Sequence, residues 1–529
     1  MHPVELVVAL LVILVALVAL AFRLKISYPI ILVLGGLFLA LPPRLPTVTL
    51  DPDLVFLVFL PPLLFSEAIN SSWRDFRENW QPIALLSVGL VFTTTIAVML
   101  VAHFSLEIAW GPAFVLGAVL GPTDTVAVSA ILERFPIPHR LLAILRGESL
   151  INDASALVLF ETAIHTTQRK IYVWGSISGH FLLALVGGVG IGLIVGWLVI
   201  RLRRHTPEPL LANTVSLLAA FAAYLPAAAL HVSGVLAVVT TGLYLSWYDP
   251  RVSTAQTRLQ ATGTWEMLTF VLNGLLFILI GLQLRTIVKP LFAEYSWSII
   301  QGCAVVSATV ILVRIVWVFT SAYLSRLFRP EHQSLDTFSP RQNATLLSWA
   351  GIRGGISLAA ALSIPPTLVD GSPFPQRNEI LVFTFAVILA TLVLQGLTLP
   401  RLLRWLRFGD EQETSVDEIK ARNAIAEEAL RYLGSVRKSD EPDQQAIAHL
   451  SEVYSKIVSV PAGESVSAAN DAAKYLMRLV SLERNIIKIQ RTKLLKLRDA
   501  GEISDDTLRT IQSVLDLKES QLIQEGPYK

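Results

Sequence analysis

The sequence predicts an all-α polytopic membrane protein with about thirteen transmembrane helices, two of them broken, followed by a helical cytoplasmic domain. Hydrophobic residues make up 53% of the 529 residues, and charged residues only 16%. Long apolar runs recur as far as residue 407, and charged residues are concentrated after it. Because a soluble domain of this length needs a polar surface, this balance indicates that lipid is the main solvent.

The first apolar run predicts a retained transmembrane helix rather than a signal peptide. The opening residues include Glu5, where a signal peptide would carry basic residues. The run that follows reaches Phe22 and is long enough to cross a bilayer.

Twelve further runs of this kind follow, separated by short polar loops. The thirteen expected spans cover residues 4–22, 27–42, 53–71, 81–104, 111–132, 140–166, 177–200, 209–228, 232–248, 266–285, 294–325, 342–364 and 379–405.

The distribution of lysine and arginine among the loops predicts the orientation. Loops after odd-numbered spans hold roughly three times as many as loops after even-numbered spans, and residues 201–204 are the densest group. Positive charge is retained on the cytoplasmic side, so we expect the N-terminus outside and the C-terminus in the cytoplasm. The membrane is expected to be the cytoplasmic (inner) membrane.

Two domains are expected, a membrane domain over residues 1–407 and a cytoplasmic tail over residues 408–529. Within the tail, residues 416–433 and 472–497 alternate apolar and charged positions at helical spacing. We interpret the tail as a soluble helical domain with a regulatory or dimer-supporting role. It contains no recognisable nucleotide or metal motif.

Charged side chains inside the predicted spans point to an ion pathway, because ionisable groups at bilayer depth are costly. Ser149, Asn152 and Asp153 lie at positions i, i+3 and i+4, so they share one face of a helix. A carboxylate flanked by an amide and a hydroxyl supplies hard oxygen ligands for a small cation. The alternative interpretation is that these buried polar residues only tie helices together.

Gly121-Pro122 and the segment 351–355 interrupt two otherwise apolar spans, the fifth and the twelfth. Matching breaks in two halves of a transporter predict discontinuous helices, here in an inverted repeat of spans 4–6 and 11–13. The helix dipole ends exposed at such breaks require opposite charges, which Asp124 and Arg353 can supply. The alternative is a simple kink at each break.

Three further charges lie in the spans. Glu67 follows a Pro-Pro pair in the third span, and Glu148 lies beside the Ser149 face. An ion pair between Glu148 and Arg353 is expected, because neither group has water to solvate it. Arg314, midway along the eleventh span, either pairs with an acid in the core or extends to the membrane interface.

Taken in order, these residues resemble the sodium/proton exchanger branch of the monovalent cation–proton antiporters. The resemblance covers residues 1–407, is greatest to bacterial members and leaves out the tail. It departs from the usual pattern at Gly355, where alanine is more common. The matching stretches are Phe59-Leu60-Pro61-Pro62 with Glu67, Gly121-Pro122-Thr123-Asp124, Gly147 to Asp153, and Trp349-Ala350-Gly351-Ile352-Arg353-Gly354.

The resemblance implies a homodimer in which each chain has a dimerisation domain and a core domain of crossed, broken helices. It implies that Asp153 binds Na⁺ and H⁺ in turn, and that Ser149, Glu67 and the backbone of Thr123 complete the Na⁺ site. Asn152 would hold the neighbouring helix.

The family's core ion pair matches Glu148 and Arg353. Related electrogenic antiporters carry two acids where this chain has Asn152-Asp153, which favours electroneutral exchange of one proton per cation.

The expected function is therefore secondary antiport of Na⁺, or of Li⁺ or K⁺, for H⁺ by alternating access, with no cofactor. A K⁺/H⁺ antiporter, a cation channel and an ion-coupled solute symporter are the alternatives. A channel would need a continuous polar pore lining, and a solute symporter a larger pocket with several hydrogen-bonding groups. An enzyme is not expected because no nucleophile or metal constellation occurs, and no nucleic-acid partner is expected.

Overall fold

The chain divides into two compact units, Met1–Asp410 and Glu411–Lys529. The structure, a computed structural model, describes most of the first unit and single residues of the second. The described residues are 3–40, 55–132, 135, 137–169, 174–206, 208–249, 252–288, 296–328, 340–406 and scattered positions from 427 to 521.

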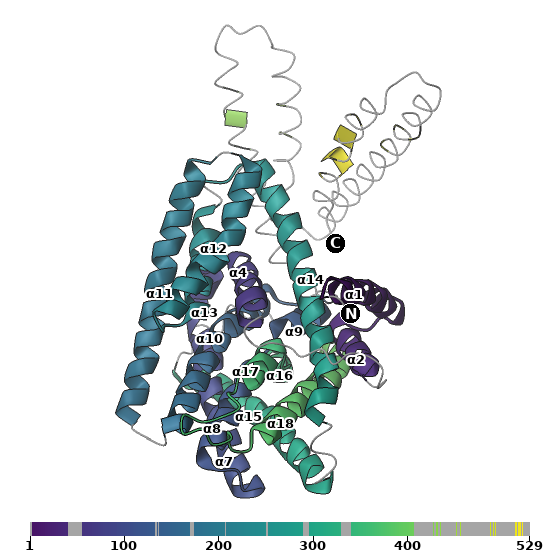
Figure 1. The fold of residues 1–529 in the computed structure, drawn as a ribbon. Helices are drawn as coiled ribbons and strands as arrows, with labels where there is room; N and C mark the ends of the chain where they lie inside the picture. Colours follow the sequence, from purple (N-terminus) through teal and green to yellow (C-terminus); the bar gives the residue numbers. More distant parts are fainter. Residues whose placement is uncertain are drawn as a thin grey trace. The chain divides into compact units, whose positions relative to one another are not determined.

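Helices make up almost all of the described part of the first unit, and the only β-pairing there is an isolated bridge between Thr367 and Pro373 (Figure 1). In chain order the elements are α1 (Pro3–Leu24), α2 (Tyr28–Ala40), η1 (Val55–Phe59), α4 (Leu60–Ile69), α5 (Trp73–Glu78), α6 (Trp80–Ala84), η2 (Leu85–Gly89), α7 (Leu90–Leu106), α8 (Trp110–Val119), α9 (Thr125–Leu132), α10 (His139–Arg169), α11 (Trp174–Arg204), α12 (Pro209–Ala229), α13 (Gly234–Tyr248), α14 (Ala255–Val288), α15 (Ser296–Phe328), α16 (Pro340–Trp349), α17 (Gly355–Leu362), α18 (Arg377–Ala390), η5 (Thr391–Gln395) and α19 (Gly396–Leu406).

Each expected span falls on one of these helices or on a run of consecutive ones, which confirms the all-α polytopic fold. Seven described helices are long and apolar enough to cross a membrane on their own, and several shorter apolar helices accompany them. Residues 41–54, which include the edges of the second and third expected spans, lie outside the described residues. The total of thirteen spans stays a prediction.

Apolar side chains are exposed on the outer helices. On α1, Val12 and Val15 are 64% and 65% exposed, and on α11 Leu183 is 66% exposed. Surfaces of this kind require an apolar environment, and lipid supplies it because the helices satisfy their own backbone hydrogen bonds. The packed interior consists of two apolar clusters. The side chains of the first cluster come mainly from α1, α2, α7–α10 and α14–α19. Those of the second cluster come mainly from α4 and α10–α13.

The two expected helix breaks are present and lie against each other. Residues 120–124 separate α8 from α9, and residues 350–354 separate α16 from α17. The backbone N–H of Asp124 donates to the carbonyl oxygen of Ile352 at 2.7 Å, so the two interrupted segments cross at these points. At Gly354 a β-carbon would collide with the Asp124 carboxylate, which explains the need for glycine at the crossing.

All described residues of the second unit are helical, and Ile487 and Leu515 pack together as a small apolar cluster. Most of the segments 416–433 and 472–497 lie outside the described residues. The regulatory role of the tail stays a prediction.

Candidate ion-binding site

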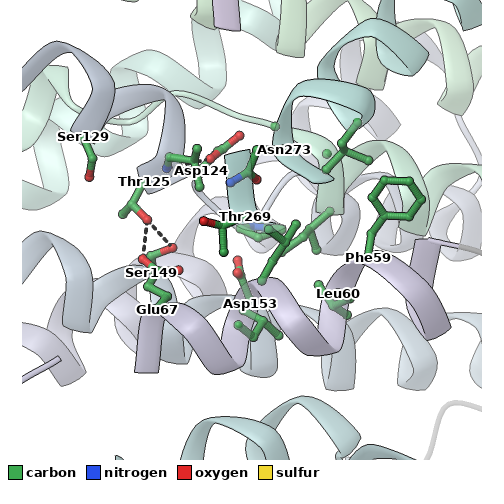
Figure 2. A pocket seen from close by; sticks show the side chains of 18 of the residues that line it. Phe59, Leu60, Glu67, Asp124, Thr125, Ser129, Ser149, Asp153, Thr269 and Asn273 are labelled. Carbon is green, nitrogen blue, oxygen red and sulfur yellow. Dashed lines mark hydrogen bonds between the residues drawn. The ribbon is translucent and has the colours of Figure 1, made fainter. Parts of the chain in front are cut away.

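A cavity of about 310 Å³ lies beside the crossing of the broken helices. Its wall is formed by α4, α9, α10, α14, the start of α17 and the 122–124 segment (Figure 2). Three acidic side chains, Glu67, Asp124 and Asp153, line this cavity, and Arg146 is the one basic side chain among its described lining residues. This excess of negative charge and oxygen atoms suits a cation.

Asp153 projects from α10 into the cavity (Figure 2). Its side chain is only 3% exposed, and its Oδ1 atom is buried without a hydrogen-bond partner. A buried carboxylate oxygen that lacks a donor is costly to the folded protein. This oxygen is therefore available to a proton or a bound cation, either of which would satisfy it.

Thr125, the first residue of α9, links the Glu67 carboxylate and the Ser149 hydroxyl. Its hydroxyl donates to Glu67 Oε1 at 2.5 Å and lies 3.0 Å from the Ser149 hydroxyl oxygen (Figure 2). Glu67 comes from α4, whose first turn contains Pro61 and Pro62 at positions where no intrahelical N–H is needed. Sequence reasoning missed Thr125, which lies directly after the expected Asp124.

Thr123 contributes two groups with different partners. Its carbonyl oxygen accepts from the Ser149 hydroxyl at 3.4 Å, on the side of the cavity. Its own hydroxyl donates to Glu148 Oε1 at 3.1 Å and accepts from Asn152 Nδ2 at 2.6 Å. Asn152 thus ties α10 to the α8–α9 break, as expected, and it does not line the cavity.

Asp124 caps the N-terminus of α9. Its Oδ1 atom accepts from the backbone N–H groups of Val126 and Ala127 at 2.9 and 3.4 Å. Gly354, at the start of α17, lies directly against the same carboxylate. One negative charge therefore faces the positive dipole ends of both broken helices, in agreement with its expected role in dipole compensation.

Arg353 provides the opposite compensation, at the C-terminal end of α8. The side chain is fully buried, and Nη1 donates to the carbonyl oxygens of Gly121 and Pro122 at 2.6 and 2.7 Å. Its backbone N–H donates to the hydroxyl of Thr391, in the π-helical turn η5. The helix-dipole prediction for Arg353 agrees with this geometry.

The expected ion pair between Glu148 and Arg353 is wrong. Glu148 instead makes two bonds with Arg314 of α15, Nη1 to Oε1 at 2.5 Å and Nη2 to Oε2 at 3.0 Å. Arg314 also donates twice to the Leu347 carbonyl oxygen near the C-terminus of α16. A β-carbon at Gly351 would collide with this guanidinium. Arg314 can thus satisfy the carboxylate and a helix end together. In Arg353, Nη1 donates to the carbonyl oxygens after α8, and Nε and Nη2 are buried without a hydrogen-bond partner.

Two polar residues of α14 face the site from the opposite wall. Figure 2 shows Thr269 and Asn273 across the cavity from Asp153. Asn273 is 8% exposed, which is unusual for an amide in an apolar helix. Sequence reasoning missed both, although an asparagine in the middle of a predicted span was a visible signal.

The arrangement can hold a small cation through carboxylate, hydroxyl and carbonyl oxygens. Of the expected ligands, Glu67, Thr123, Ser149 and Asp153 all line the cavity. Among the described residues, no group of three histidine, cysteine, aspartate or glutamate side chains is placed to hold a metal ion. The oxygen atoms that line the cavity come from carboxylate, hydroxyl and backbone carbonyl groups, which are the hard ligands that suit a small cation.

Comparison with known proteins places the chain in a family. The family model described as "Sodium/hydrogen exchanger, transmembrane" matches residues 7–405. An uncharacterised Na⁺/H⁺ exchanger of Mycobacterium tuberculosis is 37% identical over 527 residues, which are 97% of this chain and 96% of that protein. A sodium, potassium, lithium and rubidium/H⁺ antiporter of Bacillus subtilis is 30% identical over 95% of this chain and 75% of its own length.

The solved structure of a sodium proton antiporter from Methanocaldococcus jannaschii at pH 8 matches with a TM-score of 0.61. The match covers 76% of this chain and 98% of that one at 18% sequence identity. At this identity the likeness concerns the fold alone.

Proposed function

The chain belongs to the sodium/hydrogen exchanger family, and from this membership we propose that it exchanges Na⁺ for H⁺ at the cavity around Asp153. The observation that carries the proposal is the buried Asp153 oxygen without a hydrogen-bond donor, in a cavity lined by further carboxylate and hydroxyl oxygens. Either transported ion would satisfy that oxygen.

Exchange follows from competition for this one carboxylate. A proton removes the charge that attracts the cation, and a bound cation disfavours protonation, so each ion displaces the other. Binding and release on opposite sides require that the cavity open to one side at a time. α14 faces the broken helices across the cavity, and we propose that relative movement of these two walls provides alternating access.

The stoichiometry we propose is one proton for one cation, which makes the exchange electroneutral. Asn152 occupies the position next to Asp153 and binds Thr123 rather than lining the cavity. Asp124 is held by backbone N–H groups of α9, and Glu67 by Thr125. Asp153 is thus the acid with an unpartnered buried oxygen, and the one we assign to the transported proton.

The multi-pass membrane protein is proposed to lie in the cytoplasmic membrane as a homodimer, with its N-terminus outside and its C-terminus in the cytoplasm. The alternation of basic loops supports the orientation, and the family resemblance supports the dimer. Light scattering of the purified protein should give the mass of two chains; the mass of one chain would contradict the dimer.

A broader cation range is the second candidate. The Bacillus subtilis relative is named as a sodium, potassium, lithium and rubidium/H⁺ antiporter. A cavity of about 310 Å³ with mixed oxygen ligands can accommodate monovalent ions of different radius.

The test is ion flux in proteoliposomes that contain the purified full-length protein. Internal pH is followed after Na⁺, Li⁺, K⁺ or choline is added outside, with the membrane potential clamped or free. We expect internal alkalinisation with Na⁺ that is independent of the potential, and none with choline. A response to K⁺ alone would change the substrate, and a rate that follows the potential would contradict electroneutrality. No proton movement with any cation would contradict antiport.

A further inference from the structure

A second cavity, of about 390 Å³, is basic and shares only Ala130 with the described lining of the ion cavity. It is enclosed by the α1–α2 junction, the end of α9 and α19. Lys25, Arg401 and Arg404 line it, and no acidic side chain does so among its described lining residues. The side chains that line the cavity are therefore basic in character, which favours an anion.

Local structure fixes the position of Lys25. The end of α1 forms a Schellman motif, in which Ile26 N–H donates to Ala21 O and Lys25 N–H donates to Phe22 O. Lys25 therefore adopts a left-handed conformation, with φ of 56°. Arg401 and Arg404 lie one turn apart on α19, and both are exposed. The charges thus come from segments near the two ends of the first unit and are brought together only by the fold.

The floor of the cavity offers hydrogen-bond donors as well as charge. Ser27 lines it and is 7% exposed, and its buried hydroxyl makes no hydrogen bond. Ser27 also precedes α2, so the first free N–H groups of that helix begin here. A helix N-terminus next to basic side chains is a favourable place for a phosphate group. The buried Ser27 hydroxyl, which has no hydrogen-bond partner, can donate to such a group.

We propose that this cavity binds the phosphate group of an anionic phospholipid. Large apolar side chains flank its basic residues in the chain: Phe22 and Leu24 before Lys25, and Trp405 after Arg404, are 69%, 52% and 74% exposed. They offer contacts for acyl chains, which a free phosphate does not need. Exposed tryptophan beside arginine is also typical of the membrane interface.

The predicted topology agrees with this ligand. Lys25 follows the first span, α9 ends the fifth, and Arg401 and Arg404 end the thirteenth, so all are expected on the cytoplasmic side. Anionic lipids are enriched in that leaflet, and basic pockets between helices on that side bind their headgroups. The binding proposal does not depend on which ions the protein transports.

The test uses purified full-length protein in detergent and measures lipid binding by native mass spectrometry and by thermal midpoint. Phosphatidylglycerol is compared with phosphatidylcholine, and Tris phosphate with Tris chloride at equal ionic strength. The test variant is Arg401→Gln/Arg404→Gln. The matched control is Arg201→Gln/Arg204→Gln, which removes two exposed arginines with the same spacing from the end of α11, on the same expected side.

We expect phosphatidylglycerol to bind and to raise the midpoint of the wild-type protein more than phosphatidylcholine does. The Arg401/Arg404 variant should bind it roughly thirtyfold more weakly, while the Arg201/Arg204 control should bind it as the wild type does. An equal midpoint for all three proteins in phosphatidylcholine verifies that they are folded.

Equal phosphatidylglycerol binding by the wild type and the Arg401/Arg404 variant would overturn the site. Equal losses in both double variants would show a general charge effect and would also overturn it. Stabilisation by Tris phosphate without preference for phosphatidylglycerol would overturn the lipid as the source of the phosphate group.

Discussion

Replacement of Asp153 by asparagine is expected to abolish sodium-dependent proton flux in proteoliposomes. Asparagine keeps the size of the side chain but can neither take up a proton from solution nor attract a cation by charge. Because both ions are proposed to use this carboxylate, the loss should be complete for Na⁺, and also for Li⁺ or K⁺ if these are transported. The proton flux of the variant should be no greater than that of liposomes without protein.

The same substitution is expected to preserve the fold. Asp153 Oδ1 is buried without a donor, so a neutral side chain lowers the desolvation cost. Functional sites commonly retain groups of this kind at the expense of stability. The thermal midpoint of Asp153→Asn should therefore equal or exceed that of the wild type. Asp370→Asn, which makes the same change in an exposed loop, is the control and should transport normally. Retained flux in Asp153→Asn would contradict the assignment of this residue.

Removal of one partner of the buried Glu148–Arg314 pair is expected to cause the largest loss of stability. Arg314→Met should lower the free energy of unfolding by about 3–5 kcal/mol, because it leaves Glu148 buried without its partner. It also removes both donors to the Leu347 carbonyl oxygen near the end of α16. The change is measured as the shift in the denaturation midpoint of the purified protein.

A double-mutant cycle distinguishes this pair from the alternative. In a Glu148→Gln background, Arg314→Met should cost much less, because the carboxylate that needed the guanidinium is already neutral. The parallel cycle of Glu148→Gln with Arg353→Met should show a smaller coupling, since Arg353 donates to Gly121 and Pro122 instead. Strong coupling of Glu148 to Arg353 and weak coupling to Arg314 would contradict the observed pairing.

The fold could be predicted from the sequence because lipid imposes a simple rule on each span. An apolar helix satisfies its own backbone, so length and hydropathy locate the spans without knowledge of their neighbours. The breaks could be predicted for a related reason, since Pro122 lacks the N–H group that a helix interior needs and several glycines close together in 351–355 weaken a helix. The crossing of the two breaks required the family resemblance, because it depends on contacts between distant segments such as Asp124 and Ile352.

The site could be predicted only in part. Ser149, Asn152 and Asp153 share one helix, and helical spacing relates them directly. The choice between Arg314 and Arg353 for Glu148 depends on the depth and rotation of three separate helices, which spacing along the chain does not contain. Thr125 and Thr269 were missed for the same reason, because threonine is common in membrane helices and only the fold turns these two side chains toward the cavity. Asn273 is different, since an asparagine in the middle of a predicted span was a signal that sequence reasoning could have used.

The most direct test of the central claim, that Na⁺ and H⁺ compete for Asp153, is proton release on Na⁺ binding. Purified protein in weakly buffered detergent solution is titrated with sodium chloride or choline chloride over a range of starting pH, and released protons are counted with an indicator dye. We expect Na⁺ to release up to one proton per chain, choline to release none, and Asp153→Asn to release none with either salt. Sodium binding without proton release at any pH, or undiminished release from Asp153→Asn, would contradict the account.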